Sequence, residues 1–349
     1  MTGSDIGTDI QMNSRERVQR AIAFGRPDRP PVSHAVLPAA QLKHGPALDE
    51  ILTEFREDFG WDELPDQPME RWSPQYRKGL NRDDFGTVWR VEWPGICGIP
   101  VEWPLADIGR YDEYRWPADF KAGPPLERHY SGHMAGYDER WYARGGWITT
   151  FEQLQQLRGM ENLFMDIAQE PKEFRRLLDD MLAFNLRWID RWLAFEYDGL
   201  HFGDDWGTQH SLIIRPETWR RLFKPLYAEM FRKVKAAGRH VWFHSDGFIN
   251  DIVDDLIEIG VDVLNFQVAV TGYDWAAKNV RGRIAVRTDI DRQRVLPFGT
   301  PGEVKEEVRR TFEACGTADG GIIACGEVGP DVPLANIRAM YEEFRHHLY

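Results

Sequence analysis

A histidine and an aspartate stand two residues apart where an apolar run ends. The run covers residues 240–244 and leads into His244-Ser245-Asp246-Gly247. Side chains two apart on a strand point the same way, so both can reach a site just beyond the strand end. Such a pair could bind a metal ion or exchange protons. The structural alternative is that His244 donates to backbone and Asp246 caps the next helix.

Two aspartates close the preceding apolar run, residues 199–203. Because neighbouring side chains on a strand point to opposite faces, only one of Asp204 and Asp205 can face a pocket. We expect that aspartate to act in catalysis or substrate binding, and the other to cap a helix or pair with an arginine. Further candidates for substrate binding along this edge are Trp206, Gln209 and Gln267.

Four other residues, in or just after predicted strands, could take part in chemistry. Cys325 and Glu327 follow the last apolar run and could complete a metal site as a soft and a hard ligand. An unpaired cysteine is more often a small core residue. Arg287 could bind a substrate carboxylate with both nitrogens or pair with a nearby aspartate instead. His34 lies in the first predicted strand and could reach the same pocket.

These positions share one edge only if the fold brings the strand ends together. From residue 145 onwards, short apolar runs alternate with amphipathic helical patterns, which predicts successive βα units and a parallel sheet. With strand candidates upstream, the units add up to about eight, so we predict a (β/α)8 TIM barrel with its site at the carboxyl ends of the strands. No GxGxxG follows the first strand and no GxxxxGK[ST] occurs, so a doubly wound nucleotide-binding sheet is not expected.

We expect residues 1–349 to form a single barrel domain. Residues 1–13 are polar and are predicted to be a disordered terminus. Residues 83–145 interrupt the βα alternation and are rich in tryptophan. Within them, apolar and polar residues alternate on both sides of PGICG, which predicts a β-hairpin. This inserted region would cover one end of the barrel as a lid.

The bulk composition restricts the expected partners. A net charge of −13 argues against nucleic acid or an anionic membrane. No apolar run is long enough to cross a bilayer. Three cysteines without a CxxC pair do not make a disulfide framework, so we expect a protein of the reducing cytoplasm.

Several long segments are similar to the uroporphyrinogen decarboxylase superfamily. They include SRERVQRAIAFGRPDRPPV, LRGMENLFMDIAQEPKEFRRLL, the stretch from FGDDWGTQ to VDVLNFQ, and LPFGTPGEVKEEVRRTFEACG. The resemblance covers nearly the whole chain and implies an (α/β)8 barrel with its pocket at the carboxyl ends of the strands. It also implies one of two chemistries: decarboxylation of porphyrinogen acetates without a cofactor, or zinc-dependent methyl transfer that involves a corrinoid protein.

The chain departs from both branches of that superfamily. The decarboxylases carry an arginine-rich segment after the first strand, where this chain reads SHAVLPAAQLKHG. The methyltransferases carry His-x-Cys after one strand and a second cysteine after the last. Here Asp246 replaces the first of these cysteines, and Cys325 matches the second after a small shift of register. The corrinoid-binding pattern DxHxxG is absent, so a partner protein would hold any corrinoid.

We therefore expect a methyltransferase that demethylates a small methylated substrate, with zinc held by His244, Asp246 and either Cys325 or Glu327. One alternative is a cofactor-independent decarboxylase of a porphyrinogen or another carboxylate, in which a pocket aspartate stabilises developing positive charge. The other is a non-catalytic ligand-binding barrel. The expected partners are the small-molecule substrate and a corrinoid protein, with a homodimer as an open alternative.

Overall fold

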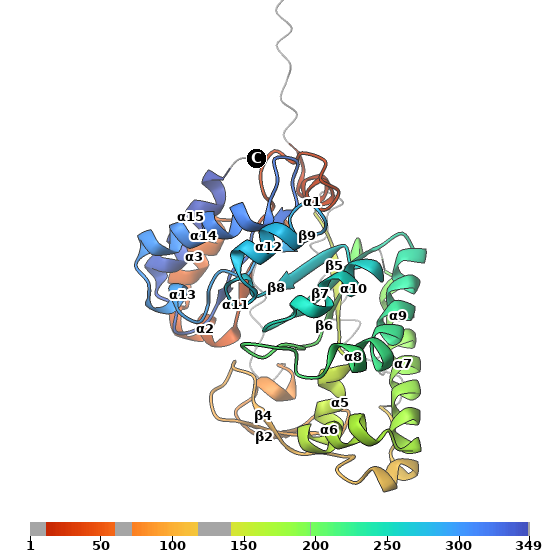
Figure 1. The fold of residues 1–349 in the computed structure, drawn as a ribbon. Helices are drawn as coiled ribbons and strands as arrows, with labels where there is room; N and C mark the ends of the chain where they lie inside the picture. Colours follow the sequence, from red (N-terminus) through yellow and green to blue (C-terminus); the bar gives the residue numbers. More distant parts are fainter. Residues whose placement is uncertain (1–11, 60–71, 118–140, 196, 348–349) are drawn as a thin grey trace, which may run out of the picture.

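Six parallel strands form the centre of the fold, with helices packed around them (Figure 1). The computed structural model describes residues 12–59, 72–117, 141–195 and 197–347. Neighbouring strands follow the order β10-β9-β8-β7-β6-β5, and a parallel pair, β1-β11, stands beside them. The parallel strands are β1 (Ala35–Val36), β5 (Arg144–Ile148), β6 (Gly199–Gly203), β7 (His240–Ser245), β8 (Val263–Phe266), β9 (Ala285–Arg287), β10 (Ile322–Ile323) and β11 (Glu327–Val328). The predicted parallel α/β class is confirmed.

Backbone hydrogen bonds join these strands into a ring. Val32, just before β1, is bridged in parallel to Ala324, just after β10. At the other edge, the Asp58 N–H donates to the Val32 carbonyl at 2.8 Å, and the Tyr142 N–H donates to the Asp58 carbonyl at 3.4 Å. Residues 57–59 therefore take the place of a further strand between β1 and β5, although they have no regular strand structure. This ring is the arrangement expected of the predicted barrel.

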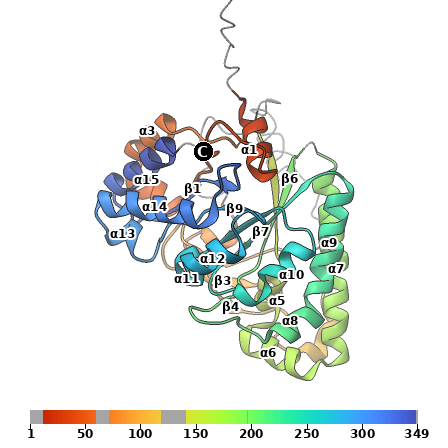
Figure 2. The same cartoon turned by 45° about the horizontal axis from the view of Figure 1, so that its top comes forward.

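Helices surround the strands, and α7 lies beside α9 along one flank (Figures 1 and 2). The long helix α7 buries the side chains of Phe174, Leu177 and Met181, which its amphipathic pattern predicts. The helices are α1 (Ser14–Ile22), α2 (Pro38–His44), α3 (Pro46–Glu54), α5 (Phe151–Arg158), α6 (Met160–Gln169), α7 (Lys172–Leu193), α8 (Pro216–Leu222), α9 (Lys224–Ala236), α10 (Val253–Glu258), α11 (Val268–Thr271), α12 (Tyr273–Asn279), α13 (Val295–Phe298), α14 (Pro301–Cys315) and α15 (Leu334–His346).

Helix α1 closes the barrel at the amino ends of the strands. It joins a small apolar cluster, here called the floor cluster, which comprises Val18, Ile22, Phe59, Tyr142, Trp242, Val263, Ala285 and Ile323. Residues that alternate with these along the strands, such as Phe243 and Leu264, belong instead to the main core. Because side chains alternate along a strand, the floor cluster marks the face of β7 and β8 that points into the barrel.

A three-stranded antiparallel sheet lies at the opposite end of the molecule from α1 (Figures 1 and 2). Its strands are β2 (Gly79–Arg82), β3 (Val88–Val91) and β4 (Ile99–Glu102). The predicted hairpin is present as β3 and β4, and β2 is an additional strand. The sheet region contacts α5 and α2, because Thr87 Oγ1 donates to the Gln156 carbonyl (2.8 Å) and the Ala39 N–H donates to the Gly95 carbonyl (3.2 Å).

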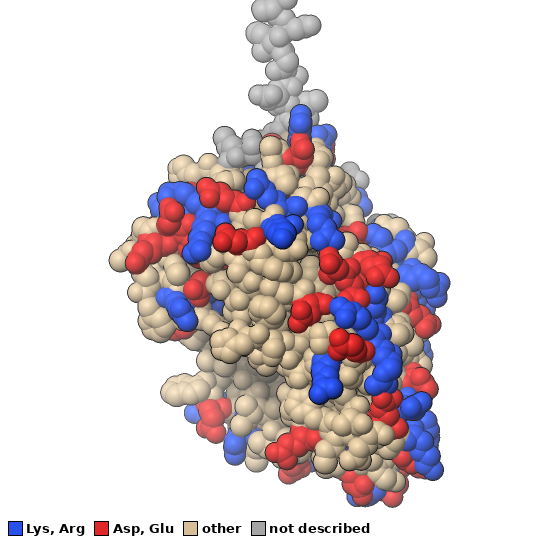
Figure 3. All heavy atoms as spheres, viewed as in Figure 1, with Lys and Arg blue, Asp and Glu red and all other residues tan. Residues whose placement is uncertain are grey.

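The described surface mixes charges of both signs. On the face shown in Figure 3, Lys and Arg side chains lie among Asp and Glu and form no continuous basic patch. Within the described ranges, no helix is long and apolar enough to cross a membrane. Two of the predictions fall partly outside the described residues, namely the terminus at residues 1–13 and the insertion at residues 83–145.

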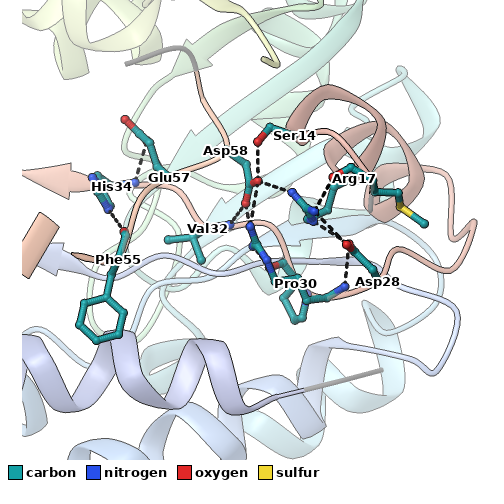
Figure 4. A network of polar contacts seen from close by, with 11 residues as sticks. Ser14, Arg17, Asp28, Pro30, Val32, His34, Phe55, Glu57 and Asp58 are labelled. Atoms are coloured by element: carbon teal, nitrogen blue, oxygen red, sulfur yellow. Dashed lines mark hydrogen bonds and ion pairs between the residues drawn. The ribbon is translucent and has the colours of Figure 1, made fainter. Parts of the chain in front are cut away.

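One buried carboxylate ties α1 and the first strand to the closing segment of the ring (Figure 4). Asp58 is 1% exposed. It accepts hydrogen bonds from Ser14 Oγ (2.8 Å), Arg17 Nη1 (2.7 Å), Arg29 Nη1 (2.8 Å) and the Val32 N–H (2.8 Å). The side chain of Asn13 caps α1, and the Ser14 hydroxyl in the first turn donates to Asp58. With so many donors on one carboxylate, Asp58 holds the closing segment in place.

Candidate functional site

Asp205, His244 and Asp246 converge at the carboxyl ends of β6 and β7. His244 Nε2 lies 3.5 Å from Asp205 Oδ1 and 3.4 Å from Asp246 Oδ1. One ligand atom from each of the three residues lies within 4.8 Å of the others. Gly203 and His244 are paired in register, as are His244 and Asn265, so these strand ends share one rim as the sequence predicts. The three side chains form a candidate metal centre.

Asn265 on β8 orients the His244 ring. Asn265 Nδ2 donates to the Arg287 carbonyl at 2.8 Å, which turns its Oδ1 toward His244. His244 Nδ1 lies 2.7 Å from that oxygen and must be the donor, because an amide oxygen only accepts. In the neutral ring, Nε2 then carries a lone pair and faces the two aspartates. A histidine whose second nitrogen donates to a fixed acceptor is the usual arrangement of a metal-binding imidazole.

Arg292 holds the acidic residues on the other side of the cluster. It forms ion pairs with Asp246 Oδ2, with Glu327 Oε1 (2.8 Å) and with Asp289 Oδ2 (3.5 Å). Burial raises the pKa of Asp289 to about 7. The other oxygen of Asp246, Oδ1, is buried and accepts no hydrogen bond. Asp246 thus has one oxygen fixed by arginine and one directed at His244 that lacks a partner.

The third member of the cluster is Asp205, and neither Cys325 nor Glu327 joins it. Glu327 is drawn to Arg292. Cys325 is 2% exposed, and burial raises the pKa of its thiol to about 11, so it is a poor metal ligand in this state. Its N–H and carbonyl both bond the Thr288 hydroxyl. The structural alternative for Cys325, a small buried residue, describes its position better than the predicted ligand role.

Asp204 points away from the cluster and caps α5. Its carboxylate is fully buried and accepts hydrogen bonds from the N–H groups of Thr150 and Glu152, each at 2.8 Å, and from Tyr227 Oη at 2.6 Å. Burial raises the pKa of Asp204. The two carboxylates therefore point to opposite sides, as side-chain alternation requires: Asp205 faces His244 and Asp204 caps α5.

Trp206 is a core residue and does not line a pocket. It is 0% exposed, its ring stacks on Phe151 at 4.0 Å between centroids, and its Nε1 donates to Tyr227 Oη at 3.1 Å. The predicted substrate contact is replaced by packing between the strand end and α5. The apolar surface of a tryptophan is worth more buried than exposed, and its N–H is satisfied here.

The remaining predicted binding residues are spread around the barrel. Gln209 is exposed. Gln267 is 7% exposed and its Oε1 accepts the Gly247 N–H at 2.9 Å, so it supports the turn after β7. His34 Nε2 bonds the Phe55 carbonyl at 2.7 Å, and burial lowers the pKa of His34 to about 4. His34 is therefore held in the first strand and away from proton exchange near neutral pH.

Arg287 reaches the neighbourhood of the cluster from inside the barrel. It is 8% exposed, and its Nη1 donates to Asn265 Oδ1 at 3.1 Å, the same oxygen that accepts from His244. Its Nε donates to Ser33 Oγ at 3.3 Å. Arg287 does not form an ion pair with Asp289, which was the alternative to substrate binding that the sequence allowed. Its guanidinium group therefore remains a candidate ligand-binding group.

Two residues at the rim were not predicted. Glu152 stands in the first turn of α5, and its pKa is raised by burial and then by the negative charges of Asp204 and Asp205. Trp147 on β5 is 52% exposed, and its ring centroid lies 5.6 Å from that of His244. Glu152 adds a carboxyl group that favours its protonated form, and Trp147 adds an apolar wall.

Two glycines let the loops after β6 and β7 touch. A Cβ on Gly207 would lie 2.3 Å from the Phe248 nitrogen and 2.4 Å from the Gly247 carbonyl carbon. Gly207→Ala should therefore force the loops apart and separate Asp205 from Asp246. We expect metal affinity to fall at least about tenfold and stability by about 1–3 kcal/mol. Metal titration by calorimetry and thermal unfolding measure the two effects.

Gly302→Ala is the matched control, because a Cβ at Gly302 would meet nothing closer than 3.9 Å. It should leave metal affinity unchanged and should not lower stability, because alanine favours a helix more than glycine does. Wild-type metal affinity in Gly207→Ala would contradict the view that this contact sets the spacing of the cluster.

Comparison with known proteins agrees with this fold. The model of a family described as uroporphyrinogen decarboxylase (URO-D) matches residues 145–347. A methyltransferase from Methanosarcina mazei has a similar structure, with a TM-score of 0.69, 15% sequence identity, and coverage of 96% of this chain and 99% of that chain. An endo-β-1,4-xylanase from Gloeophyllum trabeum is less similar, with a TM-score of 0.36, 10% identity, and coverage of 68% and 84%. No curated protein matches the chain in sequence.

Proposed function

We propose that this chain, which belongs to the uroporphyrinogen decarboxylase family, is an enzyme of the methyltransferase branch. It would demethylate a small methylated substrate and pass the methyl group to a corrinoid protein. The observation that carries this proposal is the convergence of Asp205, His244 and Asp246 on one point. A second support is the likeness in fold to a methyltransferase from Methanosarcina mazei.

The donor set of the cluster fits a divalent metal ion. His244 Nε2 faces two carboxylates, and Asp246 Oδ1 is buried without a hydrogen-bond donor, so a cation would satisfy both. One imidazole and two carboxylates suit zinc, although aspartate in place of cysteine lowers the preference for zinc over other divalent metals. When bound, zinc would act as a Lewis acid toward the heteroatom that carries the methyl group. Arg292 and Asn265 would hold the ligands in position.

We assign Glu152 as the proton donor. Demethylation breaks the bond between the methyl carbon and its heteroatom, and the electron pair stays on the heteroatom, which then needs a proton. Glu152 interacts with the charges of Asp205 and Asp246, and these charges help to raise its pKa. A carboxyl group that keeps its proton beside a reacting centre can act as a general acid.

The corrinoid is assigned to a partner protein, since the chain lacks DxHxxG. We propose that the β2–β4 sheet acts as the lid between that partner and the cluster. Tyr76, beside this sheet, interacts with the charges of Glu152 and Glu327, and burial raises the pKa of Tyr76 to about 12. Cys97, Cys315 and Cys325 are free thiols, which suits a cytoplasmic enzyme.

Decarboxylation of a carboxylated substrate is the second candidate, and Arg287 favours it as a buried carboxylate-binding group. In that mechanism a pocket aspartate such as Asp205 would stabilise the positive charge that develops on the substrate. Porphyrinogen acetates are poor candidates, because SHAVLPAAQLKHG, which includes β1, contains no arginine to pair with them. Each unpaired acetate should cost about 1–3 kcal/mol of binding.

Metal content and turnover test the proposed function together. Elemental analysis of the purified protein should find zinc at less than full occupancy. The zinc-loaded protein should transfer methyl groups from methoxylated or N-methylated small molecules to a reduced corrinoid protein, followed by the absorbance of the corrinoid. Uroporphyrinogen should not be consumed. Absence of any bound divalent metal, combined with conversion of uroporphyrinogen to coproporphyrinogen, would replace methyl transfer with the decarboxylase.

A further inference from the structure

The inside of the barrel changes from apolar to cationic just above its floor. The floor cluster ends at Trp242, and Arg144 Cζ lies 4.8 Å from the centroid of the Trp242 ring. Arg287 lies one register level higher, paired with Asn265, which is itself paired with His244. Two guanidinium groups therefore line the barrel interior next to the floor cluster, and Arg287 shares the register level of His244.

Neither arginine has an anionic partner. In the described part of the chain, no carboxylate lies within ion-pair distance of Arg144 or Arg287, and Arg144 Nη1 is buried without a hydrogen-bond acceptor. Glu57 is an acidic group that interacts electrostatically with both arginines, but its carboxyl oxygen accepts the His34 N–H. Buried arginine is costly without a partner, so two unpaired guanidinium groups indicate a missing anion.

A third polar atom points to the same ligand. His201 is 6% exposed, and its Nε2 is buried without a hydrogen-bond partner. Burial, and then the charges of Arg144, Arg287 and His244, lower the pKa of His201. Trp147 packs edge-on against His201 at 4.7 Å between centroids and covers Gly203 so closely that a Cβ there would clash. The anion would thus sit between guanidinium groups with an aromatic wall on one side.

We propose that the barrel interior binds the carboxylate of a small substrate against Arg144 and Arg287, with the apolar part of that substrate against Trp147. Guanidinium groups bind planar carboxylates through paired hydrogen bonds. Burial raises the pKa of Glu57 to about 8, so this carboxyl group supplies no full countercharge to the two arginines. The aromatic wall at Trp147 favours a carboxylate that carries an apolar group over inorganic phosphate. This inference rests on the proposed function in one respect, namely that the carboxylate bound in the barrel is also the methyl donor.

The position of the arginines fixes which end of the substrate reacts. Arg287 Nη1 and His244 Nδ1 both donate to Asn265 Oδ1, so a carboxylate on Arg287 lies next to the candidate metal centre. The opposite end of a small molecule would then reach Asp205 and Asp246 at the rim. The carboxylate is held in the interior, and the methylated heteroatom faces the cluster.

Binding of benzoate to metal-free protein tests this proposal separately from methyl transfer. Calorimetry after EDTA treatment should detect benzoate, while the isosteric but uncharged benzamide should bind at least about tenfold more weakly. Arg287→Gln and Arg144→Met should each weaken benzoate binding at least about tenfold. Arg26→Gln, which removes an arginine that is 80% exposed, is the matched control and should bind benzoate as the wild type does.

Thermal unfolding separates ligand binding from a structural role of Arg144. Because its charge is unpaired in the ligand-free protein, Arg144→Met should unfold at the same or a higher temperature than the wild type without ligand. It should lose the upward shift that benzoate gives the wild type. A lower melting temperature for ligand-free Arg144→Met, equal binding of benzoate and benzamide, or binding of inorganic phosphate in place of benzoate would each overturn the proposal. Loss of methyl transfer with benzoate binding intact would overturn only the proposed function.

Discussion

Replacing His244 with alanine is expected to remove bound metal and lower methyl transfer at least about a hundredfold, while the protein stays folded. His244 supplies the only nitrogen ligand of the cluster, and without it two carboxylates remain. Its side chain is 16% exposed at the barrel mouth, so alanine removes little core packing. Elemental analysis, the corrinoid-coupled assay and thermal unfolding on one preparation measure all three effects.

The matched control is His346→Ala at the end of α15, where the ring only bonds the Glu342 carbonyl. It should keep wild-type metal content and rate. If His244→Ala also kept its metal, the cluster would not be the metal site, and His244 and Asp246 would be reassigned to substrate binding or acid–base chemistry.

Most of the barrel follows from the hydrophobic pattern, and the exceptions are short elements. Strand β6 lies where the sequence predicts it, because a short apolar run marks it clearly. The helices α2, α11 and α12 have four to seven residues and were not predicted. The closing segment at residues 57–59 has no strand pattern at all. Its backbone pairing depends on the buried Asp58 side chain and therefore on contacts with distant residues.

The sequence predicts which strand ends carry the candidate site, but it predicts the contacts between their side chains less well. The alternation of side chains required Asp204 and Asp205 to part, and this is observed. It could not decide which of the two faced His244, because that depends on the position of α5. The ion pair between Arg292 and Glu327 could not be predicted either, because sequence spacing does not show which acidic residue pairs with an arginine.

The sequence contains weak signals for some of the site residues that were not predicted. Arg292 is a lone cation in TDIDRQ, directly after a strand, and a cation among acidic residues at a strand end is a natural organiser of carboxylates. Glu152 opens the helix that Asp204 caps, so its position follows once Asp204 is assigned. Arg144 is the first residue of a strand, where the sequence predicts a solvent-exposed side chain. Only closure of the barrel places this side chain inside.

Replacing Asp58 with asparagine should lower the free energy of unfolding by about 3–5 kcal/mol. Asparagine keeps the shape but removes the charge, and its amide nitrogen would face donors from Ser14, Arg17 or Arg29. Arg17 is 4% exposed and would keep only Asp28 as its acidic partner. Because Asp58 also joins the backbone ring, the loss should open the barrel between β1 and β5. Equilibrium unfolding in urea measures the change.

Asp319→Asn provides the comparison, because Asp319 pairs with Arg26 at the surface, where the two side chains are 50% and 80% exposed. Loss of that pair should change the free energy of unfolding far less, since water screens exposed charges and solvates them when the partner is removed. The two variants make the same chemical change, so the difference between them isolates burial. A cost for Asp58→Asn as small as that for Asp319→Asn would mean that the closing segment does not depend on this carboxylate, and that the barrel is held shut by the floor cluster instead.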